Sequence, residues 1–181
     1  MIVKRIIKRL LPPGTAGFRV AQAAGRFLHI LPPATSMDGA YEEWIKDSEP
    51  QFWEAQYSFT YEPLISIVVP VFNAPDYYLL PMVYSITNQK YQNWELILVN
   101  ASTDSSCRKL TEDCAEIDSR IKVVDLEKNG GIAYNTNQGL AACTGEYVAL
   151  LDHDDLFAPH ALAEVVAVLQ GSPAKRPQFI Y

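Results

Sequence analysis

The sequence lacks any apolar run of the roughly 20 residues that a helix needs to cross a bilayer. It has only three cysteines, an odd count without metal-ligand spacing. This count argues against a disulfide framework or a zinc site and favours buried or half-buried thiols in a reducing compartment. A net charge of -6 argues against nucleic-acid binding. What remains is a globular protein, in keeping with 49% hydrophobic and 20% charged residues.

Acidic residues are missing from the first thirty positions, although several of the 15 basic residues lie there. Residues 2–11 alternate apolar and basic pairs, which predicts a helix with one apolar and one cationic face, and a second amphipathic stretch covers 18–31. Such helices can bind an anionic membrane surface; packing on the domain or on a partner is the alternative. We expect residues 1–62 to form a basic helical extension and strap, with 1–31 contacting the inner membrane face of an otherwise cytoplasmic protein.

From Pro63 onward, β-branched runs alternate with helical stretches. Strands are predicted over 64–72, 95–100, 121–125, 146–151 and 178–181. Helices are predicted over 77–88, 103–117, 132–143 and 159–170, the last beginning with Pro159. The alternation predicts an α/β domain over 63–181 with a mostly parallel sheet and helices on both faces. Because right-handed crossovers place the carboxyl ends of the strands at one edge, we expect ligands to bind there.

Three carboxylates follow the fourth predicted strand, at Asp152, Asp154 and Asp155, with His153 among them. Acids this close repel one another, and a divalent cation removes that cost. Oxygen ligands favour Mg or Mn, which also bind substrate phosphates. A solvated turn that caps the next helix through Asp155 is the alternative. At the end of a central strand, the pattern favours a metal site at Asp152 and Asp154. Alternation along the strand end makes His153 a neighbour and not a ligand.

The ends of the first two strands carry further polar candidates. Pro70 is costly inside a sheet ladder, so we expect the backbone to leave the sheet there and Asn73 to lie at the tip. After the second strand come Asn100, Ser102 and Asp104, which suit the floor of a base or ribose pocket. An ordinary helix cap by Ser102 or the next residue explains the same pattern.

A glycine pair opens the third candidate segment. Gly130 and Gly131 let backbone amides approach a ligand, and the following helix N-terminus favours anions. The pattern is not the G-x-G-x-x-G dinucleotide fingerprint. Asn135 and Asn137 are poor helix formers, which predicts that the side chain of one of them makes a functional polar contact. Solvent exposure of Asn137 is the alternative.

Together these segments resemble the family 2 glycosyltransferases, which have a GT-A, Rossmann-like fold. The matching motifs occur in the family's order over 66–73, 93–104, 129–137 and 144–155. Each motif alone is modest, but four in order are specific. The resemblance covers residues 63–181, and 41–44 is similar to the segment before this domain in bacterial cell-surface polysaccharide, rhamnosyltransferase-like members.

The resemblance implies inverting sugar transfer from a UDP- or dTDP-sugar to a saccharide acceptor in cell-surface polysaccharide biosynthesis. Asn100 stands where the family usually has an aspartate that contacts the base. Mn or Mg would lie at Asp152 and Asp154, as a Lewis acid for the leaving diphosphate. With the candidates above, the predicted donor-binding residues are Pro70, Phe72, Asn73, Asn100, Ser102, Asp104, Gly131, Asn137 and Asp152.

In this family the catalytic base is usually an aspartate of the later half, which also builds the acceptor site. The resemblance therefore places the base beyond Tyr181, and we expect a C-terminally truncated domain that binds donor weakly and transfers little sugar. A non-catalytic nucleotide-sugar-binding or membrane-adaptor protein with the same fold is the alternative. A haloacid-dehalogenase-type phosphotransferase also has an acid pair after a strand, but that pair lies near the chain start, whereas this one follows the fourth strand.

Overall fold

The computed structural model describes residues 55–171, 177 and 180. The chain divides into two compact units, Met1–Ser58 and Phe59–Tyr181. The membrane-contact segment predicted over 1–31 lies outside the described residues, as does most of the predicted extension over 1–62. The predicted strand over 178–181 also falls outside them, except for Ile180, which is not in a strand. Within the described ranges, no helix is long and apolar enough to cross a membrane.

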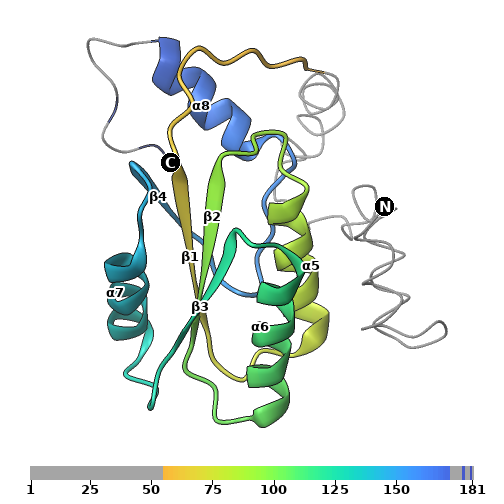
Figure 1. Cartoon of the computed structure of the whole chain (residues 1–181), viewed down its shortest axis with the longest axis vertical. Helices are drawn as coiled ribbons and strands as arrows, with labels where there is room; N and C mark the ends of the chain where they lie inside the picture. The colour runs from red at the N-terminus through yellow and green to blue at the C-terminus, as the bar shows by residue number, and fades with distance from the viewer. Residues whose placement is uncertain (1–54, 172–176, 178–179, 181) are drawn as a thin grey trace, which may run out of the picture. The chain divides into compact units, whose positions relative to one another are not determined.

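Four strands of the second unit form one sheet in the order β3-β2-β1-β4. They are β1 (Ile65–Val71), β2 (Trp94–Asn100), β3 (Ile121–Asp125) and β4 (Tyr147–Leu150). Each neighbouring pair runs parallel, which confirms the predicted parallel sheet. The carboxyl ends of the strands therefore lie together, at the lower edge in Figure 1.

Helices cover both faces of this sheet, as predicted (Figure 1). Helix α7 (Ile132–Ala142) lies on one face, and α5 (Asp76–Thr87) and α6 (Ser105–Ile117) lie on the other. The chain then continues into α8 (Ala161–Gly171). On the α7 face, a Cβ added to Gly139 would lie 2.5 Å from Val68 and 2.7 Å from Val99, so glycine permits the close approach of helix and sheet.

All three cysteines are free thiols, which agrees with the expectation from their odd number. Cys107 and Cys114 are buried in α6, and Cys143 after α7 is half-buried. Burial raises the pKa of the Cys114 thiol to about 12, with a smaller contribution from the charge of Asp113. Cys114 is therefore protonated at neutral pH and packs as a small apolar side chain.

Two helices begin two residues later than predicted. Helix α6 begins at Ser105, because Asp104 is its N-cap and accepts hydrogen bonds from the backbone N–H groups of Ser106 (3.2 Å) and Cys107 (3.3 Å). The predicted cap at Ser102 or the residue after it is therefore wrong. Helix α8 begins at Ala161 instead of Pro159. The Pro159 carbonyl accepts a 2.7 Å bond from Lys90 N, which holds the proline in the preceding turn.

Pro70 stays inside β1, contrary to the prediction that the backbone leaves the sheet there. Backbone groups of β1 alternate in direction: Val71 O accepts from Ala101 N after β2, whereas Val68 O accepts from Leu151 N after β4. Pro70 therefore faces the β4 side, where strand pairing has already ended. Its missing N–H removes no bond to β2, and the strand continues to Val71.

Candidate functional site

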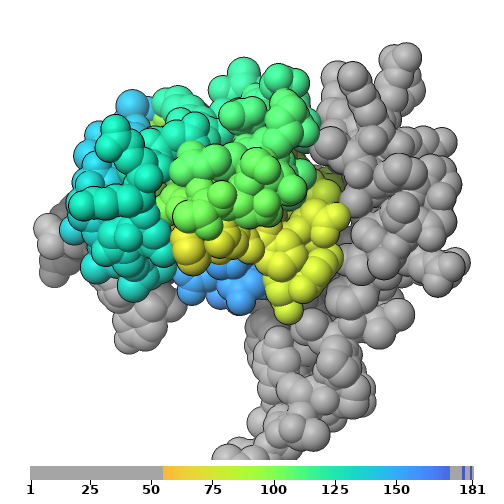
Figure 2. All heavy atoms as spheres, turned by 90° about the horizontal axis from the view of Figure 1, so that it is seen from below, coloured from red at the N-terminus to blue at the C-terminus, as the bar shows by residue number. Residues whose placement is uncertain are grey.

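A cavity of about 330 Å³ opens at the carboxyl edge of the sheet. Figure 2 views this end, where the end of β1 and the segment after it (yellow) lie beside the segments that follow β3 (teal) and β4 (blue). The cavity is lined by residues from these three parts of the chain: Pro70 and Phe72; Asn129, Gly131, Ile132 and Asn135; and Asp152, His153 and Asp154. The parallel topology thus gathers residues that are far apart in the sequence.

Five predicted site residues line this cavity together. Phe72 is 43% exposed and offers apolar surface at the end of β1. Asp152 and Asp154 are exposed and line the same cavity. Pro70 and Gly131 complete the set. Apolar surface, a helix N-terminus and carboxylates therefore meet in one hollow.

The start of α7 is shaped by Gly131 and two asparagines. Gly131 has φ +88°, a left-handed conformation that favours glycine. Asn129 Oδ1 accepts from Gly131 N and from Asn135 Nδ2, both at 2.9 Å. Asn135 Oδ1 accepts in turn from Gly130 N at 3.2 Å. Asn135 is buried and ties the glycine loop to the first turn of the helix.

Asn137 is the predicted donor-binding residue of α7 that does not line the cavity. It is exposed, and Asn135 lines the cavity in its place. Two residues along an α-helix correspond to a rotation of roughly 200°, so the two asparagines belong to opposite sides of α7. The sequence left open which of the two asparagines has a polar role, and the one that lines the cavity is Asn135.

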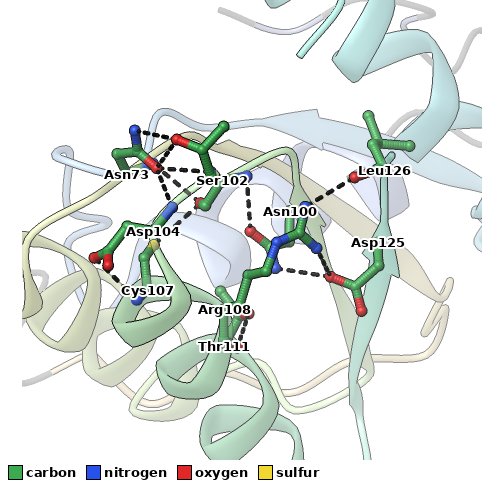
Figure 3. Close-up of polar contacts among 10 residues, drawn as sticks. Asn73, Asn100, Ser102, Asp104, Cys107, Arg108, Thr111, Asp125 and Leu126 are labelled. Atoms are coloured by element: carbon green, nitrogen blue, oxygen red, sulfur yellow. Dashed lines mark hydrogen bonds and ion pairs between the residues drawn. The ribbon is translucent and has the colours of Figure 1, made fainter. Parts of the chain in front are cut away.

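Asn73 joins the ends of β1 and β2 (Figure 3). Its backbone has φ 49°, uncommon for a non-glycine residue but tolerated by asparagine. Its Oδ1 accepts from the backbone N–H groups of Thr103 (2.9 Å) and Asp104 (3.0 Å). Its own N–H donates to Ser102 Oγ at 3.0 Å. Asn73 and Asp104 thus shape the entry to α6.

Asn100 and Ser102 are completely buried. Asn100 Nδ2 donates to Asp125 Oδ1 at 2.7 Å, and its Oδ1 accepts from Ser102 N at 3.1 Å. Arg108 Nη1 also donates to Asp125 Oδ1, at 3.1 Å (Figure 3). In this structure Asn100 and Ser102 hold neighbouring residues in place. A ligand could contact them only if the residues that cover them moved.

Arg108 and Asp125 belong to this network, although the sequence did not single them out. Arg108 also donates to Leu126 O at 2.9 Å and so links α6 to the end of β3. The available signal was positional: Asp125 ends the third predicted strand, at the same edge as the other candidates. Asp125 is followed by one further acid, Glu127, and then by Lys128, so this strand end lacks the dense run of acids found at 152–155.

A family model described as glycosyl transferase family 2 matches residues 66–175. The chain belongs to glycosyltransferase family 2. The match runs from the second residue of β1 past the end of α8 and includes every residue that lines the cavity. The predicted family is therefore confirmed.

Curated relatives of this family 2 chain include two bacterial proteins that are named for the biosynthesis of O-antigen and of teichuronic acid. The O-antigen biosynthesis protein RfbC of Myxococcus xanthus is 36% identical over 147 residues, which is 78% of this chain and 12% of that protein. The putative teichuronic acid biosynthesis glycosyltransferase TuaG of Bacillus subtilis is 39% identical over 95 residues, 52% of this chain and 37% of that protein. The chain thus spans well under half the length of these relatives.

Solved structures of similar fold support the GT-A assignment. S. aureus TarS 1-349, in complex with UDP-GlcNAc, has a TM-score of 0.55 and 26% identity, covering 60% of this chain and 32% of that chain. A Pyrobaculum calidifontis mannosyltransferase, in complex with GDP-Man and Mn2+, has a TM-score of 0.55 and 20% identity, covering 82% and 42%. The second likeness concerns the fold alone.

The carboxylates at this family 2 site suit a cation that is also bound by the phosphates of a substrate. In the described part of the chain, no group of three or more His, Cys, Asp or Glu side chains is arranged to bind a metal. Asp152 and Asp154 nevertheless present two exposed carboxylates to the cavity. Mg²⁺ commonly takes one or two carboxylates and completes its shell with water and substrate phosphates. Two carboxylates therefore fit such a shared site.

Proposed function

We propose that this domain binds a nucleotide-diphosphate sugar in the edge cavity, for inverting transfer of the sugar to a saccharide acceptor in cell-surface polysaccharide biosynthesis. One observation carries the proposal: apolar surface, a helix N-terminus and two exposed carboxylates line a single cavity of about 330 Å³. The solved relative with UDP-GlcNAc supports the class of donor. The relatives named for O-antigen and teichuronic acid biosynthesis support the class of product.

Each part of the cavity has a chemical counterpart in such a donor. Phe72 and Ile132 offer exposed apolar surface to the base and ribose. The N-terminus of α7 favours a phosphate, because the first backbone N–H groups of a helix lack intrahelical partners. Asp152 and Asp154 would hold Mg²⁺ or Mn²⁺ beside the diphosphate. When bound, that cation supplies Lewis-acid stabilisation of the leaving diphosphate.

Titration calorimetry on the 181-residue chain tests the proposal, with UDP, dTDP and GDP as probes and with or without Mn²⁺. We expect saturable binding of one nucleotide class that is at least several-fold tighter with Mn²⁺, and loss of the Mn²⁺ effect in Asp152→Asn and Asp154→Asn. Glu127→Gln is the matched control, since Glu127 is exposed and does not line the cavity. Absence of metal-dependent binding by the unmodified chain would favour a non-catalytic adaptor instead.

Residues 1–31 are proposed to bring the chain to an anionic membrane surface. The support is the pattern of apolar and basic pairs over 2–11. Co-sedimentation with vesicles should show binding to anionic but not to neutral lipid. Replacing Lys4, Arg5, Lys8 and Arg9 with glutamate should abolish it, and unchanged sedimentation of that variant would contradict the proposal.

A further inference from the structure

The hydrogen-bond ladder between β4 and β1 ends at Pro70, where the side chain of His153 contacts the strand in place of a backbone N–H. Rungs advance two residues at a time: Tyr147 N donates to Leu64 O at 3.4 Å, and Leu151 N donates to Val68 O at 3.2 Å. The same step would bring the backbone N–H of residue 153 to Pro70 O. Instead, His153 Nδ1 lies 3.3 Å from Pro70 O.

The proline already removes the preceding bond of this ladder. Pro70 has no N–H, so it cannot donate to Leu151 O, the β4-side bond before the one that residue 153 N would make to Pro70 O. The backbone then turns away from the sheet, and Asp155 N donates to Asp152 O at 3.2 Å. The acidic turn over 152–155 therefore keeps one hydrogen bond to β1, through the imidazole of His153.

The hydrogen-bonding partner determines which ring nitrogen carries the proton. A backbone carbonyl only accepts hydrogen bonds, so Nδ1 of His153 must be the donor. Nδ1 is the ring nitrogen nearer the main chain, and it reaches about as far as the amide nitrogen of an asparagine. On the far side of the turn, Phe157 N donates to Ser85 Oγ of α5 at 3.2 Å. The turn is thus held at both ends.

We propose that His153 is a positioning residue of the acidic turn: its imidazole takes the place of its own backbone N–H as hydrogen-bond donor to Pro70 O and holds Asp152 and Asp154 at the cavity. All three side chains line that cavity. The inference rests on the proposed function, because it takes a nucleotide diphosphate and a divalent cation as the ligands. It gives a role to a residue that the sequence marked only as a neighbour of the carboxylates.

Three variants of the full chain separate this role from others. His153→Asn places a donor near the position of Nδ1, His153→Gln places one near Nε2, and His153→Phe keeps the ring without a donor. Calorimetry with UDP, with and without Mn²⁺, measures the metal-dependent part of binding. We expect the Asn variant to stay within about twofold of the unmodified chain. The Phe and Gln variants should lose roughly 10-fold or more, as for other residues that orient metal ligands.

Two outcomes of this experiment would overturn the inference. Retention by Gln with loss by Asn would mean that Nε2 contacts the ligand directly. Equal metal-dependent binding in all three variants would mean that the Pro70 contact has no positioning role. The far-UV circular dichroism of each variant, compared with that of the unmodified chain, separates a loss of metal-dependent binding from a general loss of folding. If the Phe variant does not fold, the Asn and Gln variants still decide.

A second measurement does not depend on ligand binding. Long-range ¹H–¹⁵N spectra of the unmodified chain report which ring nitrogen of His153 is protonated, with the His153→Asn spectrum identifying its signals among the three histidines. We expect the Nδ1–H form. The Nε2–H form would overturn the inference whatever the chain binds. The Nδ1–H form in a chain that binds none of the nucleotides would support the tether and overturn the proposed function alone.

Discussion

Glu95 at the amino end of the sheet and the pair Asp152 and Asp154 at its carboxyl end are held in opposite ways. At the amino end, Glu95 is buried and its side chain accepts 2.6 Å bonds from Ser66 Oγ, Thr144 N and Lys122 Nζ. At the carboxyl end, Asp152 and Asp154 are exposed, and none of the described residues donates a hydrogen bond to their carboxylates. A buried charge is tolerable only when it is paired and hydrogen-bonded, whereas an exposed one stays available to a ligand. The first arrangement serves stability, and the second suits binding.

The comparison predicts its largest effect for removal of the buried carboxylate. Glu95→Ala leaves the hydroxyl of Ser66 and the N–H of Thr144 without their acceptor and the Lys122 ammonium without its partner. We expect the free energy of unfolding to fall by on the order of 4 kcal/mol, measured by urea denaturation. Exposed Glu127→Ala is the control and should change little. A loss below about 1 kcal/mol would mean that the amino-end network is only a surface ion pair.

Stability should also depend on pH through the same carboxyl group. Burial raises the pKa of Glu95, but the hydrogen bonds from Lys122, Ser66 and Thr144 outweigh it and lower the pKa from 4.5 to about 2. Because the folded pKa is the lower one, this contribution is complete above about pH 4.5 and is lost as the pH falls toward 2. We expect Glu95→Gln to remove about 3 kcal/mol of this acid dependence. Denaturation curves at stepwise lower pH measure it, and an unchanged slope in the variant would assign the loss to other acids.

The glycines at the two ends should differ as the carboxylates do. A Cβ on Gly145, at the amino end, would lie 2.6 Å from Leu64 O and 2.7 Å from Ser66 N, so the backbone itself would have to move. A Cβ on Gly130, at the carboxyl end, would lie 2.3 Å from Tyr134 Cδ1 and 2.9 Å from Tyr134 Cβ. The ring of Tyr134, which is 47% exposed, can rotate away, but its Cβ belongs to the first turn of α7, so the glycine loop would also have to shift slightly. We expect Gly145→Ala to cost about 2 kcal/mol, because it meets backbone atoms of β1, and Gly130→Ala a smaller amount of about 1 kcal/mol, because it meets one side chain beside an exposed loop, both measured by urea denaturation. The reverse order would contradict a rigid amino end and an adaptable carboxyl end.

The sequence predicted the order of strands and helices because β-branched runs and helical stretches alternate clearly, and it placed the carboxylates at the correct edge. It misjudged Pro70, because the direction of a backbone N–H relative to a neighbouring strand depends on register. It chose Asn137 over Asn135, because composition alone does not show which side of α7 faces the sheet. The contacts of Arg108 with Asp125 and Leu126 join α6 to β3, and no local pattern marks such a long-range pairing.

The smallest effect on stability, and the largest on binding, is expected at the carboxyl end. Asp152→Asn and Asp154→Asn each remove one charge from a crowded acidic turn without emptying a buried site. Like charges repel, so the midpoint of thermal unfolding should stay the same or rise slightly, as measured by scanning calorimetry. Metal-dependent nucleotide binding should nevertheless be lost in both variants, since each carboxylate is proposed as a ligand. A variant that loses stability and keeps metal-dependent binding would contradict the comparison. The carboxylate at the carboxyl end would then stabilise the fold and would not bind the metal.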